Sequence, residues 1–187
     1  KYRVSAHDAD MKETEAIYGQ TDSGMTIIEG HLFLNGKKPI QHRSSYGLGE
    51  VIKAALDNHT EHLVISLGGI GSFDGGAGML QALGATFYDD EAQIVDMRKG
   101  AYLIKYIRRI DLSGVHPQLA KVNIQLMSDF SSRLYGKKSE IMQTYESLDL
   151  SQNEAAEIDN LIWYFSELFK NELKIAMGPI ERGGAGG

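Results

Sequence analysis

The sequence predicts a single α/β domain with a mixed β-sheet and flanking helices. Short β-favouring runs fill the first 29 residues, an apolar run at 63–67 leads into a glycine-rich turn and a helical pattern, and residues 151–169 carry a long amphipathic stripe. Strands that alternate with helices over 187 residues, with no visible internal repeat, are typical of one α/β layer structure. We therefore expect one domain over residues 1–187.

Three short strands are expected at the start of the chain. Residues Lys1–Val4, Glu13–Tyr18 and Met25–Glu29 favour β-structure, and turn-forming residues separate them. This spacing predicts a small antiparallel meander. The His7–Asp10 turn has side chains that can hold a hard cation, but its composition is more typical of a polar loop.

A helix and a buried strand come next. Apolar residues repeat at helical spacing over 46–58, and either Ser44 or Ser45 can accept a hydrogen bond from a free first-turn amide. The continuous apolar run Leu63–Leu67 is too short for a helix and predicts a strand buried on both faces.

Four shorter elements follow. We expect a helix at Ala77–Leu83, a strand at Ala85–Tyr88, a helix at Tyr102–Ile107 and a second buried strand at Val122–Met127. Asp129 stands just past the end of this last strand, where ligand sites of open α/β sheets lie.

The last predicted helix has the clearest boundary signal. Ser151 and Glu154 have the spacing of a capping box, which satisfies two free amides at a helix start. The residues that form its apolar stripe are Ile158, Leu161, Ile162, Phe165, Leu168 and Phe169. We assign this stripe to the core.

Composition excludes several classes of function. A formal net charge of −6 leaves no basic surface for nucleic acid, and no apolar run approaches the roughly 20 residues of a membrane span. The absence of cysteine excludes disulfides and thiolate sites, which fits a cytoplasmic protein.

The glycine-rich turn at 68–76 is the strongest candidate site. Glycines let backbone amides approach an anion closely, and the free amides of the following helix favour negative charge there. Asp74 occupies a helix-capping position, so a purely structural role is an open alternative. The turn lacks the glycine at position 74 of a dinucleotide loop, the Gly-Lys-Ser/Thr of a P-loop and the glycines of a nucleophile elbow.

The C-terminal run Gly183–Gly187 has two interpretations. It is either a flexible linker or a phosphate-cradling loop, and composition favours the linker.

A family resemblance rests on four stretches. Residues 67–85, L-G-G-I-G-S-F-D-G-G-A-G-M-L-Q-A-L-G-A, resemble the signature L-G-G-S-A-T-N-D-G-G-A-G-M-L-Q-A-L-G-A of the bacterial glycerate kinase family. Residues 44–50 resemble its T-S-Y-G-x-G-E, residues 109–114 its R-I-D-x-S-G, and residues 183–187 its G-A-G-A-A-G-G. The stretches follow the family's order along the whole chain.

The resemblance implies an ATP-dependent kinase that phosphorylates glycerate with the help of Mg²⁺. Family members have two α/β domains that face each other across the active-site cleft. This chain would be the inserted domain, packing against a Rossmann-like domain that lies outside it, and alone it should not turn over. The implied partners are therefore ATP and a small hydroxy acid.

The resemblance also implies roles for single residues. Asp74 would orient the glycerate hydroxyl or hold Mg²⁺, and Ser72 would donate a hydrogen bond. The residues that would bind substrate or phosphate are Gly68, Gly69, Ser72, Gly75, Gly76, Ser45 and Asp129. No residue is assigned as a dedicated metal ligand.

The departures from the family pattern leave two functions open. Ile70 and Phe73 replace polar residues and are expected to narrow or dry the pocket, and residues 141–146 lack the lysine of the family's F-G-P-Q-K-G. One hypothesis is a divergent kinase for glycerate or a related small hydroxy acid. The alternative is a catalytically degenerate protein that acts as a small-molecule sensor or partner subunit.

Overall fold

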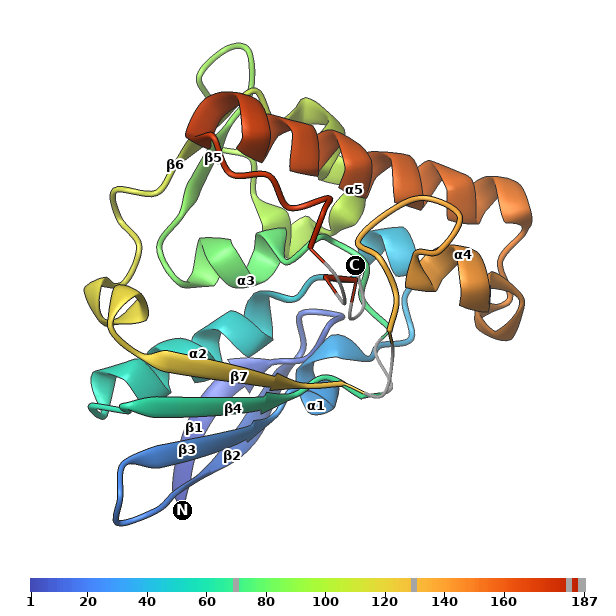
Figure 1. Cartoon of the computed structure of the whole chain (residues 1–187). Coiled ribbons are helices and arrows are strands. Elements are labelled where there is room, and N and C mark those ends of the chain that lie inside the picture. The colour runs from blue at the N-terminus through green and yellow to red at the C-terminus, as the bar shows by residue number, and fades with distance from the viewer. Residues whose placement is uncertain (69–70, 129–130, 181–182, 185–187) are drawn as a thin grey trace.

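A five-stranded mixed sheet forms the base of the molecule (Figure 1). The computed structural model describes residues 1–68, 71–128, 131–180 and 183–184. The strands, in sheet order, are β1 (Tyr2–His7), β2 (Glu13–Gln20), β3 (Met25–Glu29), β4 (His62–Ser66) and β7 (Asn123–Met127). A mixed sheet with flanking helices is the predicted fold class, which is confirmed.

The pairing changes once across the sheet, from antiparallel to parallel at β3. β1, β2 and β3 pair antiparallel, which confirms the predicted meander, whereas β3, β4 and β7 pair parallel. In the parallel half Ile28 lies opposite Ile65, and Ile65 lies opposite Leu126. The carboxyl ends of the parallel strands therefore meet at one edge, and the glycine-rich turn begins there.

One face of the sheet is buried beneath α2 (Tyr46–Asp57), as Figure 1 shows. This helix lies where its periodicity predicted. Its apolar stripe packs on alternate residues of the strands because successive strand side chains point to opposite faces. The buried contacts of this core include Ala16, Tyr18, Ile28, Val51, Ile52, Ala55, Leu56, Leu63 and Ile65. α3 (Ala77–Ala82) packs along α2.

Most of the other elements form a second layer above α3, spanned by the long helix α5 (Figure 1). They are α4 (Glu140–Thr144), α5 (Gln152–Leu173), the antiparallel pair β5 (Thr86–Tyr88) and β6 (Arg109–Asp111), and the 3₁₀ helices η1 (Ile40–His42), η2 (Met97–Lys99), η3 (Ala101–Tyr106) and η5 (Tyr145–Leu148). The helix α1 (His31–Leu34) and the 3₁₀ helix η4 (Pro117–Ala120) belong to the lower layer, where Phe33, Leu34 and Leu119 pack against the core of the sheet and α2. Phe165 joins α5 to β5, since its ring lies 5.6 Å from that of Phe87, edge to face.

The capping box of α5 is present as predicted. The Ser151 hydroxyl accepts from the Glu154 amide at 3.3 Å, and the Glu154 carboxylate accepts from the Ser151 amide at 2.8 Å. The predicted apolar stripe is core on its inner side, with Ile158, Ile162 and Phe165 buried.

Three sequence predictions need correction. The strand predicted at Val122–Met127 is not buried: β7 is the sheet's edge, every residue in it is exposed, and the Leu126 side chain is 58% exposed. β4 is fully buried only on the face of Leu63 and Ile65, since Val64 stays partly exposed. The helix predicted at 102–107 is the 3₁₀ helix η3.

Within the described residues, no helix is both long and apolar enough to cross a membrane.

Candidate functional site

A cavity of about 250 Å³ opens at the carboxyl edge of the parallel strands. Five of the residues predicted for the site line it, namely Ser45, Ser72, Asp74, Gly75 and Gly76. Gly68 lies in the turn that follows β4 and is not among the lining residues. Gly69 and Asp129 lie outside the described residues.

The centre of the site is the Asp74 carboxylate, which is 1% exposed. Its Oδ2 accepts hydrogen bonds from the Ser45 amide at 2.8 Å, the Ser45 hydroxyl at 2.9 Å and the Gly78 amide at 3.1 Å. Among the described residues, its Oδ1 accepts from the Gly76 amide alone, at 3.1 Å. Since each carboxylate oxygen has two lone pairs, Oδ1 keeps an acceptor site.

This carboxylate joins the starts of two helices. Ser45 is the N-cap residue of α2, and Gly78 lies in the first turn of α3. The Asp74 carbonyl also accepts from the Ala77 amide at 3.0 Å, so the residue does satisfy first-turn amides as a capping position predicts. The formal N-cap position of α3 is Gly76.

The Ser45 hydroxyl does not cap its own helix. It donates to Asp74 and accepts from the Met79 amide at 2.9 Å, so it ties α3 to α2. Ser44 provides the contact predicted for this pair, because its hydroxyl accepts from the Tyr46 amide at 3.2 Å.

Burial raises the pKa of the Asp74 carboxyl above its ordinary value. The hydrogen bonds from Ser45, Gly78 and Gly76 act in the opposite direction, since they favour the charged form. Buried carboxyls with a shifted pKa occur both at functional sites and in structural hydrogen-bond networks, so the pKa of Asp74 is compatible with either role.

Two glycines make the turn at Asp74 possible. Gly75 and Gly76 both have left-handed backbone, with φ of +61° and +74°, which strains residues that carry a Cβ. The Gly76 amide donates to Asp74, whereas the Gly75 amide has no hydrogen-bond partner among the described residues and is free to face an anion.

Ser72 has the least satisfied side chain of the site. Its hydroxyl is buried, lines the cavity and, within the described residues, has no hydrogen-bond partner. A buried hydroxyl without a partner is costly, and such groups in native structures call for an explanation such as a ligand.

The rest of the cavity wall is apolar and was missed by sequence reasoning. It consists of Leu34, Leu48, Ile65, Leu67, Met79, Leu126, Leu134, Met177 and Ile180, together with Gly183. Leu134, Met177 and Ile180 come from segments with no local motif, so the sequence carries no signal that they meet here. None of these described lining residues is cationic.

Phe73 does not narrow the pocket as expected. It is 1% exposed and packs in a separate core cluster with Leu134, Ile141 and Ile158. The apolar replacement at position 73 is therefore a core residue. Ile70, the other replacement, lies outside the described residues.

The C-terminal glycine run begins as a docked segment. The Ser132 hydroxyl donates to the Gly184 carbonyl at 2.8 Å, and the Gly184 amide donates to the Ser132 carbonyl at 3.3 Å. Gly184 is buried, so this position is not a free linker. Residues 185–187 lie outside the described part of the chain.

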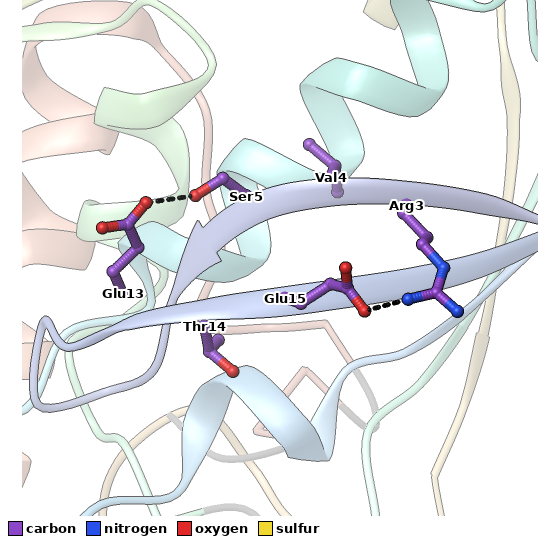
Figure 2. A pocket seen from close by; sticks show the side chains of 6 residues that line it. All are labelled: Arg3, Val4, Ser5, Glu13, Thr14 and Glu15. Carbon is purple, nitrogen blue, oxygen red and sulfur yellow. Dashed lines mark hydrogen bonds and ion pairs between the residues drawn. The ribbon is translucent and has the colours of Figure 1, made fainter.

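A second hollow, of about 420 Å³, lies on the β1–β2 hairpin. Figure 2 shows its side chains paired with one another, Arg3 with Glu15 at 2.6 Å and Ser5 with Glu13 at 2.8 Å. It is open, its ion pair is exposed, and it contains none of the residues predicted for the site. The cavity at Asp74 is therefore the better candidate.

Comparisons with known proteins match the chain over its full length. A model of the glycerate kinase family matches residues 1–187. Glycerate kinase from Halalkalibacterium halodurans is 29% identical over 180 residues, which cover 92% of this chain and 47% of that protein. Glycerate 2-kinase from Escherichia coli is 30% identical over 144 residues, which cover 77% of this chain and 37% of that protein.

A solved structure is also similar to the whole chain. A crystal structure of a Salmonella typhimurium LT2 protein assigned as glycerate kinase 2 superposes with a TM-score of 0.92 at 26% identity, covering all of this chain and 51% of that one. The chain thus spans about half or less of the length of these relatives. From the match over its full length, we conclude that the chain belongs to the glycerate kinase family.

Proposed function

We propose that the protein containing this chain transfers the γ-phosphate of ATP to a hydroxyl of glycerate or a related small hydroxy acid. The observation that carries the proposal is the pairing of Asp74 with Ser45 at a cavity that is also lined by the buried Ser72 hydroxyl, which has no partner among the described residues. Membership of the glycerate kinase family supports phosphate transfer as the reaction, and the name of a relative, glycerate kinase, supports glycerate as the acceptor.

Asp74 is proposed to act on the acceptor. Its Oδ2 is held by Ser45 and Gly78, whereas Oδ1 has one donor and can accept the acceptor's hydroxyl proton in a hydrogen bond. The two carboxylate oxygens therefore divide a structural and a chemical task. The Ser72 hydroxyl would donate a hydrogen bond to the bound acid.

The glycine turn is proposed to face phosphate. Backbone amides of Gly68, Gly69 and Gly75 would approach an anion because these residues have no Cβ. Gly76, whose amide bonds Asp74, would contribute by letting the phosphate approach the turn closely. In phosphoryl transfer the protein mainly positions groups and stabilises charge, so such amides suffice as a cradle. Asp129, which comes two residues after the end of β7 in the sequence, is also a proposed binding residue.

The proposed cofactors are ATP and Mg²⁺. Within the described residues, no group of three or more His, Asp or Glu side chains could hold a metal ion. Mg²⁺ is commonly held by one or two carboxylates together with substrate phosphates. As the alternative to its role on the acceptor hydroxyl, Asp74 Oδ1 would supply the single carboxylate here. When bound, the ion would neutralise charge on the transferring phosphate.

We propose that residues 1–187 form one domain that packs against a Rossmann-like domain and is inactive alone. The absence of a cationic side chain among the described cavity residues supports this, because phosphoryl transfer requires positive charge that other parts of the protein would add.

A second candidate function is a sensor or partner subunit that binds the acid without turnover. The observation that favours it is the apolar wall of the cavity, which is well suited to binding but offers little to chemistry.

The test is ADP release by the full-length protein with ATP, Mg²⁺ and D-glycerate, measured for the wild type and for Asp74→Asn. We expect turnover in the wild type and its loss, by at least about 100-fold, when the carboxylate is removed. Asp159→Asn is the matched control, since Asp159 is also buried and accepts from the Gly136 amide and the Ser139 hydroxyl. Its turnover per folded molecule should stay close to wild type.

Two outcomes would contradict the proposal. Turnover that survives Asp74→Asn would leave Asp74 as a structural residue only. No turnover, with glycerate or ATP still raising the melting temperature, would favour the sensor function.

A further inference from the structure

A guanidinium is held against the glycine-rich turn by the segment that precedes α2. Arg43 donates from Nη1 to the Gly71 carbonyl at 2.7 Å and from Nε to the Lys38 carbonyl at 2.8 Å. Gly71 is also fixed on its other side, because its amide donates to the Leu34 carbonyl at 3.3 Å. The turn and the arginine are therefore held in one fixed arrangement.

The close approach explains the residue at position 71. A Cβ there would lie 2.6 Å from the Asn35 Oδ1 and 2.8 Å from the Arg43 Nη1. A larger residue would therefore push the ends of these two side chains away, and glycine lets the guanidinium reach the turn in the observed position.

The guanidinium has donors to spare. It carries five N–H groups, and the two bonds to backbone carbonyls use two of them. The side chain is partly exposed, so the remaining N–H groups can serve a ligand. A planar guanidinium with free donors is well matched to phosphate oxygens.

Arg43 supplies positive charge near a cavity whose described lining has none. The described residues that line the cavity beside Asp74 include no cation, and Arg43 lies outside that lining, against the turn that leads to Ser72. The nearby Asp10 carboxylate, which interacts with Arg43, is already bonded by the amides of Lys37 and Lys38. Arg43, with Lys37 and Lys38 on the same segment, brings positive charge to the turn in a chain whose net charge is −6.

We propose that Arg43 is the phosphate-facing cation of this chain, held beside the glycine turn by Lys38 and Gly71, and that its ligand is the phosphate chain of the phosphoryl donor. This inference rests on the proposed phosphotransfer. It assigns to Arg43 a binding role that acts on the nucleotide and not on the acceptor acid.

The experiment compares the full-length wild type with Arg43→Met and Arg43→Lys by steady-state kinetics with ATP, Mg²⁺ and D-glycerate. Loss of a charged hydrogen-bonding partner should raise the KM for ATP about tenfold or more in Arg43→Met, while the KM for glycerate changes little. Arg43→Lys keeps the charge but cannot make both backbone bonds, so it should recover part of the ATP affinity. Added salt should weaken ATP binding more in the wild type than in Arg43→Met.

The matched control is Arg108→Met. Arg108 also donates from Nη1 to backbone carbonyls, those of Lys105 and Ile107, but beside α5 and away from the turn. Its KM for ATP should stay within about twofold of the wild type. A structural role for Arg43 alone would lower the melting temperature in both Arg43 variants and leave the KM for ATP unchanged, which would overturn the inference.

The proposed function can fail separately. If the wild type releases no ADP, the role of Arg43 is tested by the change in melting temperature on adding ATP and Mg²⁺. A rise in the wild type that is absent in Arg43→Met supports the inference. An equal rise in both proteins, or no rise in the wild type, overturns it.

Discussion

The Asp74 carboxylate accepts hydrogen bonds from both the amide and the hydroxyl of Ser45, 29 residues earlier in the chain. Through this pair the start of α2 is joined to the turn that opens α3. Because Asp74 also lines the cavity, the same carboxylate that joins the two helices can contact a ligand bound there. Experiments at this site must therefore separate stability from binding.

Ser45→Ala should destabilise the protein. It removes one bond to Asp74 and leaves the buried Met79 amide without its partner, so we expect a loss of about 1–3 kcal/mol in the free energy of unfolding. Urea denaturation measures this loss. Ser5→Ala is the control, because its hydroxyl bonds Glu13 at an exposed position and should cost little. Equal losses in the two variants would argue against the joint between α2 and α3.

Ser72→Ala should separate stability from function. The Ser72 hydroxyl is buried without a partner among the described residues, so its removal should leave the free energy of unfolding unchanged or raise it by up to about 1 kcal/mol. If this hydroxyl binds the acid, the same variant should raise the KM for the acceptor.

The control for that experiment is Ser44→Ala, whose buried hydroxyl does have a partner in the Tyr46 amide. It should lower stability. A Ser72→Ala protein that is destabilised, with an unchanged KM, would indicate that the hydroxyl has a structural partner instead of a ligand.

The elements of the fold were predictable because their signals are local. The capping box of Ser151 and Glu154, the helical spacing over 46–58 and the strand-turn-helix order around Asp74 each depend on neighbours within a few residues. Five residues of the cavity wall were also predicted, since they lie in one turn or in the motif at 44–50.

What failed depends on contacts between distant segments. Whether β7 is central or at the edge is decided by which strand lies beside it, and its apolar residues gave no hint of exposure. The direction of Phe73 and the contact between Arg43 and Gly71 likewise depend on tertiary packing. A single sequence contains no signal for such pairs.

Gly78→Ala should be costly although alanine normally stabilises a helix. A Cβ at position 78 would collide with the Ser44 hydroxyl and lie 2.7 Å from the Tyr46 amide and 2.9 Å from Asp74 Oδ2. Overpacking of this kind should cost about 1–3 kcal/mol, which exceeds the gain in helix propensity. Thermal and urea unfolding measure the loss. Gly19→Ala is the control, since a Cβ there has open space; a stable Gly78→Ala protein would show that α2 and α3 can separate at no cost.

Asp10 gives the prediction on pH. Its side chain is buried, and its oxygens accept from the amides of Lys37 at 2.8 Å and Lys38 at 3.0 Å. Burial alone would raise the pKa of this carboxyl, but the two amides, with Lys12 and Arg43 nearby, together lower it below its ordinary value of 3.8.

A lowered folded-state pKa means that the charged carboxylate stabilises the fold above pH 3.8, and that this contribution disappears as the pH falls through the lower folded-state pKa. Asp10→Asn should therefore cost about 1.5–3 kcal/mol of unfolding free energy at pH 7. The gap between variant and wild type should shrink as the pH falls below 3.8, because protonation then stabilises the unfolded wild-type chain and, at the lower folded-state pKa, neutralises the native carboxylate as well. Urea unfolding of both proteins from pH 7 to pH 3 measures the gap, and a gap that stays constant over this range would show that the charge of Asp10 contributes nothing.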